Sequence, residues 1–149
     1  VTAEDLVQPP EGTRSEAGLR NNVSVGLQYL ESWLGGNGCV PLYSLMEDAA
    51  TSEIARTQVW QWVRYGAKLD DGRTVTPELF REVLDEELEA IKSEVGESRF
   101  EQGHFGAARE LFEELVTAEQ CADFLTLPAY DLLKSIHLPP LGERRESVR

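Results

Sequence analysis

Two adjacent carboxylates, Glu47 and Asp48, stand where a loop with several glycines ends and a helical pattern begins. Acidic residues favour the first turn of a helix, because their charge complements the helix dipole. The same position suits a general base, since helix-terminal N–H groups stabilise an ionised carboxylate and the loop can present it to a substrate. From these residues alone, helix capping and catalysis both stay open.

The same loop carries a thiol, Cys39, among apolar side chains. A nucleophilic cysteine needs a histidine or another cation close by, and His104 and His137 are far away in the sequence. We therefore expect Cys39 to be an ordinary small buried thiol without a catalytic role. The two cysteines and two histidines are too dispersed for a metal site, and we find no phosphate-binding loop or Ser/His/Asp signature.

Composition narrows the possible partners. The 149 residues, 41% of them hydrophobic, suffice for one domain with a real core. The net charge of −13 opposes binding to nucleic acid or to an anionic membrane, and no apolar run is long enough to cross a bilayer. Two isolated cysteines form no disulfide framework, which favours a cytoplasmic location.

Apolar residues at three-to-four spacing predict helices that position this loop. Ser15 and the pair Thr76-Pro77 supply helix starts. No stretch alternates as a strand does, so the predicted fold is all-α: a compact bundle of about five helices with short loops and an extended N-terminal linker. The expected helices cover residues 15–34, 48–65, 76–96 and 105–116, with shorter pieces at 118–125 and 128–136.

The helix after the loop carries two further expectations. Ile54 is expected on its inner face, and a cap at Thr57 leaves open a bend near Arg56. The chain as a whole is divided into a linker (1–14), one helical domain (15–136) and a polar, flexible tail (137–149).

The loop and its surroundings resemble the malate synthase family, in its shorter A-type form. The segment Met46-Glu47-Asp48, followed by Ala49-Ala50-Thr51, is the most specific part of the resemblance. The likeness extends over about residues 10–135. The blocks that carry it are residues 19–22, 28–34, 36–41, 45–51, 58–64 and 124–130.

The resemblance implies a function for the loop. Malate synthases condense the acetyl group of acetyl-CoA with glyoxylate to give malate and CoA, a step of the glyoxylate cycle linked to the tricarboxylic acid cycle. Asp48 matches the family's catalytic aspartate, which removes a proton from the acetyl methyl group. Met46 and Glu47 are expected to bind substrate in the same cleft.

The resemblance also implies what lies elsewhere. In the family, Mg²⁺ and a catalytic arginine belong to a β/α barrel, which a C-terminal helical domain caps. Residues 15–136 are expected to be that cap and residues 1–14 a linker from the barrel, which is this chain's expected partner. The chain is therefore expected to bind no metal and to be inactive alone. A non-catalytic helical interaction module and a fragment that binds acetyl-CoA alone are the alternatives.

Overall fold

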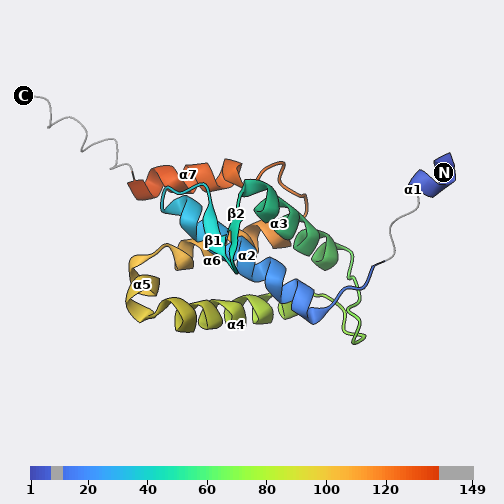
Figure 1. Cartoon of the computed structure of the whole chain (residues 1–149), viewed down its shortest axis with the longest axis horizontal. Helices are drawn as coiled ribbons and strands as arrows, with labels where there is room; N and C mark the ends of the chain where they lie inside the picture. The colour runs from blue at the N-terminus through green and yellow to red at the C-terminus, as the bar shows by residue number, and fades with distance from the viewer. Residues whose placement is uncertain (8–11, 138–149) are drawn as a thin grey trace, which may run out of the picture.

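Helix α2 (Glu16–Leu34) runs through the middle of the molecule, and the other long helices pack around it (Figure 1). The computed structural model describes residues 1–7 and 12–137, so part of the predicted linker and the tail from residue 138 lie outside the described residues. The all-α fold class is confirmed. The long helices packed against α2 are α3 (Ala49–Arg64), α4 (Pro77–Val95), α6 (Phe105–Thr117) and α7 (Thr126–His137).

Local signals account for the long helices. Ser15 Oγ accepts a hydrogen bond from the Gly18 N–H, and Thr76 Oγ1 accepts one from the Leu79 N–H, so both predicted caps are confirmed. The apolar faces of the helices meet in one core. Its largest fully buried apolar side chains include Leu19, Leu27, Tyr29, Phe80, Phe112 and Ile91.

The helical piece predicted at 118–125 is wrong. The segment is irregular because its backbone groups bond to side chains of α3 instead of to one another. The Ala118 carbonyl accepts from the Trp60 indole, and the Ala122 carbonyl accepts from Arg56. The Leu125 N–H donates to Glu53. A tertiary contact has replaced local helical bonding.

Two short helices are absent from the sequence-based prediction. Helix α1 (Ala3–Val7) lies in the segment predicted to be extended, where Thr2 and Asp5 exchange backbone-to-side-chain hydrogen bonds in a capping box. Helix α5 (Glu97–Gln102) lies between Gly96, whose φ is 87°, and Gly103. A six-residue helix without a capping side chain gives too short a pattern to recognise.

Helix α3 is continuous from Ala49 to Arg64, so no second helix begins near Arg56. The Thr57 hydroxyl donates to the Glu53 carbonyl inside the helix and does not cap a new one. The prediction that Ile54 faces the core is wrong, because 66% of Ile54 is exposed. The buried residues of α3 are Ser52, Ala55, Arg56, Val59 and Trp62.

The prediction of no strands is also wrong at one place. Strands β1 (Val40–Leu42) and β2 (Leu45–Glu47) form an antiparallel hairpin within the loop that joins α2 to α3. Three residues a side are too few for strand alternation to be visible in the sequence. None of the helices within residues 1–7 and 12–137 combines the length and apolar character that crossing a membrane requires.

Candidate functional site

Asp48 lies where the hairpin meets helix α3. Strand β2 ends at Glu47, and Asp48 is the N-cap residue of α3. Its Oδ1 accepts the Thr51 N–H at 3.2 Å. Its Oδ2 takes part in no hydrogen bond or ion pair within the described part of the chain, and the residue is exposed. One carboxylate oxygen therefore caps the helix, while the other stays accessible.

The neighbouring candidates point in different directions. Successive residues of a strand face opposite sides of the ribbon, so Glu47 shares a face with Leu45 and Met46 faces the other way. Glu47 lines a hollow of about 230 Å³ between the hairpin, α2 and α3. Met46 does not line this hollow and is 67% exposed. A substrate role for Met46 and Glu47 stays a prediction.

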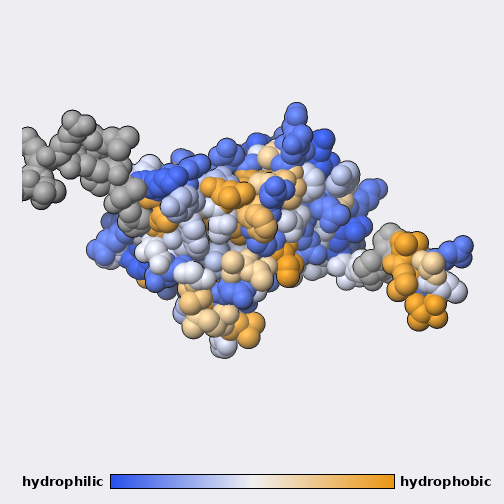
Figure 2. Space-filling view, turned by 90° about the horizontal axis from the view of Figure 1, so that it is seen from above, coloured by the Kyte–Doolittle hydropathy of each residue, from blue (hydrophilic) through white to orange (hydrophobic). Residues whose placement is uncertain are grey.

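Exposed apolar side chains lie around Glu47 and Asp48 on the surface of the molecule. Leu45 on the hairpin is 63% exposed, comparable to Met46 beside it and Ile54 on α3. Figure 2 shows apolar groups on a lobe that projects from the body at the place where Figure 1 draws the hairpin. Exposed apolar patches that are rimmed by polar residues are typical of interaction surfaces.

Hydrogen bonds from α2 hold the hairpin loop. The Tyr29 hydroxyl donates to the Gly38 carbonyl at 3.1 Å, and the Ser32 hydroxyl donates to the Cys39 carbonyl at 3.3 Å. Burial raises the pKa of the Tyr29 phenol, and the negative charge of Asp48 nearby raises it further. The phenol therefore stays protonated and remains a donor at neutral pH. Sequence reasoning missed this role, because Tyr29 fits the apolar stripe of its helix.

The tip of the hairpin has an unusual backbone. The two turn residues, Tyr43 and Ser44, have φ values of 49° and 67°. A two-residue hairpin turn favours such values, but asparagine and glycine normally supply them. For other residues the left-handed conformation costs on the order of 1 kcal/mol each. The Tyr43 and Ser24 hydroxyls share a hydrogen bond of 2.9 Å, which ties this turn to α2.

A buried ion pair lies farther along α3. Arg56 is only 1% exposed, and its guanidinium contacts Glu53 Oε2 at 2.6 Å. It also donates to the Ala122 carbonyl at 2.7 Å, while Glu53 Oε1 accepts from the Leu125 N–H. This pair fixes the 118–125 segment against α3 and was not identified from the sequence. The helical spacing of Glu53 and Arg56 was its only signal.

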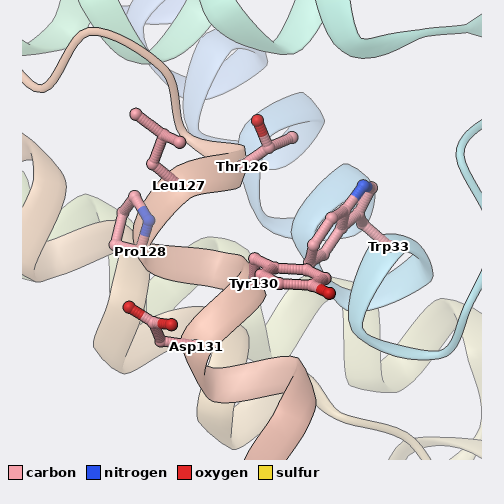
Figure 3. Close-up of a pocket in the computed structure, with 6 residues that line it drawn as sticks. All are labelled: Trp33, Thr126, Leu127, Pro128, Tyr130 and Asp131. Carbon is pink, nitrogen blue, oxygen red and sulfur yellow. The ribbon is translucent and has the colours of Figure 1, made fainter.

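A second hollow, of about 550 Å³, lies between the end of α2 and the start of α7. Figure 3 shows the rings of Trp33 and Tyr130 close together on one side of it, with Pro128 and Asp131 on the other. Asp48 is not among its lining residues.

Cys39 is exposed, so the expected buried thiol is wrong; the loop turns its side chain outward while its carbonyl binds Ser32. Among residues 1–7 and 12–137, no group of three or more His, Cys, Asp or Glu side chains could hold a metal ion. His104 is the N-cap residue of α6; its N–H donates to Glu31, and its ring lies near Gly35, where the loop begins, rather than beside Glu47 or Asp48. Within the described part of the chain, Glu47 and Asp48 therefore lie together without a cysteine–histidine pair beside them.

Fold and site define a helical domain whose candidate acid lies on its outer surface beside an apolar hairpin. Comparison with known families gives a match over residues 13–133 to the family described as "Malate synthase, C-terminal". The chain belongs to this family, which confirms the resemblance found in its sequence.

Relatives agree with the family match. Malate synthase A of Escherichia coli (strain K12) is 52% identical over 133 residues, which are 89% of this chain and 25% of that protein. Malate synthase of Myxococcus xanthus (strain DK1622) is 56% identical over 131 residues, 88% of this chain and 24% of that protein. The glyoxysomal malate synthase of Zea mays is 52% identical over 140 residues, 92% of this chain and 25% of that protein. The chain spans about a quarter of the length of these relatives.

Proposed function

We propose that this chain is the C-terminal domain of an enzyme that condenses acetyl-CoA with glyoxylate to give malate and CoA, and that Asp48 is its general base. The observation that carries the proposal is the exposed Asp48 carboxylate, with one oxygen unpaired among the described residues, at the edge of a projecting apolar hairpin. The sequence around it belongs to a malate synthase family.

In the proposed reaction, the Asp48 carboxylate removes a proton from the acetyl methyl group. The enolate carbon then attacks the aldehyde carbon of glyoxylate, and the aldehyde oxygen takes up a proton to give malyl-CoA. Water hydrolyses the thioester to malate and free CoA. A carboxylate is a weak base for a carbon acid, so the enolate needs electrostatic stabilisation from elsewhere.

That stabilisation is assigned to the partner, the β/α barrel of the same enzyme. This chain has a net charge of −13, and the described part has no cluster of acids suited to a metal. We therefore assign Mg²⁺, the arginine and the groups that bind the CoA phosphates to the barrel. The apolar surface formed by Leu45, Met46 and Ile54 is the proposed contact with it.

Asp48→Asn in the full-length enzyme tests the proposal. Asparagine caps a helix as well as aspartate does, so α3 and the melting temperature should be preserved. Loss of the base should lower kcat by about 10²- to 10⁴-fold in a thiol-release assay. Asp48→Ser, which also caps, should be equally inactive. Unchanged turnover by Asp48→Asn would refute the assignment and favour a non-catalytic interaction module.

The isolated chain is proposed to be inactive. Thiol release in a mixture of acetyl-CoA, glyoxylate and Mg²⁺ should stay at the level of the blank, because the enolate-stabilising groups are assigned to the barrel. Calorimetry with acetyl-CoA should likewise show no binding, since an acidic chain repels the CoA phosphates. Turnover or measurable affinity would contradict this division of roles and support the fragment that binds acetyl-CoA alone.

A further inference from the structure

The hairpin that precedes Asp48 has little packing of its own. In β1 and β2 the one buried side chain is Leu42, which contacts Val25 of α2 and Ala55 of α3. Leu45 and Met46 are exposed. Apolar packing therefore restrains the hairpin at Leu42 and at the half-buried Val40, and hydrogen bonds supply further, polar restraints.

Those restraints come from one stripe of α2, formed by Ser24, Gln28, Tyr29 and Ser32 and termed the α2 polar stripe. Its members recur at helical spacing on the side that faces the loop. Tyr29 and Ser32 donate to loop carbonyls at the start of the hairpin. Ser24 meets the Tyr43 hydroxyl at the far end, and Gln28 donates to Ser24 at 3.1 Å. The hairpin is thus held at both ends.

Of the contacts at the two ends of the hairpin, the one between Tyr43 and Ser24 gives more information about function. Tyr43 keeps a left-handed backbone, which asparagine or glycine would adopt more easily, and its hydroxyl reaches a serine that is only 2% exposed. A strained conformation persists only where its surroundings determine it. The hydrogen bond between the Tyr43 and Ser24 hydroxyls is therefore one of the contacts that hold this turn.

We propose that Tyr43 is a positioning residue for Asp48, acting through its hydrogen bond to Ser24 of the α2 polar stripe; this inference rests on the proposed function. The register pairs Val40 with Glu47, the residue directly before Asp48. Any shift or tilt of the hairpin therefore moves the point at which α3 begins. Holding the tip of the hairpin keeps the Asp48 carboxylate in line with the acetyl group.

The test is Tyr43→Phe in the full-length enzyme. The change removes one hydroxyl and keeps the ring and the backbone. We expect kcat to fall about 3- to 10-fold, the factor that a lost hydrogen bond provides. KM for acetyl-CoA and for glyoxylate should stay within about twofold of wild type, because a positioning defect acts on the chemical step.

Two matched controls separate positioning from general damage. Tyr65→Phe removes the hydroxyl of a tyrosine at the other end of α3, which is exposed and makes no hydrogen bond with its side chain in the described part of the chain. Ser44→Gly relieves the second left-handed residue of the turn and leaves the Tyr43 hydroxyl in place. Both variants should keep wild-type kcat.

A double-mutant cycle identifies the bond itself. Ser24→Ala should lower kcat by a similar factor, and the double variant with Tyr43→Phe should lose little more than either single variant. The proposal is overturned if the loss of kcat in the double variant equals the product of the two single losses. It is also overturned if Tyr43→Phe leaves kcat unchanged, or if its KM rises by the same factor as its kcat falls. If Asp48→Asn is inactive while Tyr43→Phe is normal, only the positioning role fails; if Asp48→Asn is active, the proposed function itself fails.

Discussion

In the buried ion pair of Arg56 and Glu53, we expect removal of one partner to destabilise the chain more than removal of the other. The Arg56 side chain is 2% exposed, whereas the Glu53 side chain is 22% exposed. A guanidinium keeps its charge inside a protein, so removing Glu53 leaves that charge buried with only a carbonyl and a thiol as partners. Removing Arg56 leaves a carboxylate that water can reach and that still accepts from the Leu125 N–H.

The magnitudes follow from these environments. Glu53→Ala should destabilise the chain by about 3–5 kcal/mol, the usual cost of breaking a buried pair so that one charge is left alone. Arg56→Met fills a similar volume without a charge, and its main loss is the bond to the Ala122 carbonyl. We expect it to cost about 1–3 kcal/mol.

Urea denaturation of the 149-residue chain, followed by tryptophan fluorescence and circular dichroism, measures both free energies of unfolding. Glu97→Ala is the control, because its ion pair with Lys92 is at the surface and should contribute less than about 1 kcal/mol. If Arg56→Met proved as costly as Glu53→Ala, or more so, the reasoning from the buried charge would be refuted.

Two further predictions concern the fold. Gly26→Ala should destabilise the chain by about 1–2 kcal/mol, because a Cβ at Gly26 would lie 2.7 Å from the Phe112 ring. The control, Gly106→Ala, would place its Cβ where no atom lies within 4 Å and should not destabilise the chain. Thermal denaturation of the two variants tests this difference. Hydrogen bonds from Arg81, and to a smaller extent from Arg109, lower the pKa of Glu113. The folded state therefore gains stability from these bonds above the ordinary carboxyl pKa near 4.5, and it loses that stability as the pH falls through the lower folded pKa. Glu113→Gln should therefore cost about 0.5–1 kcal/mol at pH 7 and almost nothing near pH 2, and equal losses at both pH values would contradict the linkage.

The long helices were predictable because their apolar spacing and their caps agree. Ser15 and Thr76 begin helices where the sequence predicts them, and the apolar residues Phe80, Val83 and Leu84 of α4 are buried. Where local signals and packing point to the same structure, sequence alone suffices.

The errors arise where contacts between distant segments decide the structure. The 118–125 segment has helical residues, but its carbonyls bind Trp60 and Arg56, which lie some sixty positions earlier in the chain. The hairpin has strands too short to recognise and depends on α2 for its restraints. Ile54 fits the helical stripe, yet it lies at the surface beside the hairpin.

The two interpretations of Asp48 that the sequence leaves open are compatible in the structure. Capping uses Oδ1, and the other oxygen remains accessible at the surface. The cap fixes the rotation of the carboxylate, because its bond to the Thr51 N–H holds one oxygen against the helix. A base held in this way loses little conformational freedom when substrate arrives, which is how orientation contributes to catalysis. Helix capping at this position is therefore part of what the proposed base requires, and a variant that keeps the cap but not the charge separates the two roles.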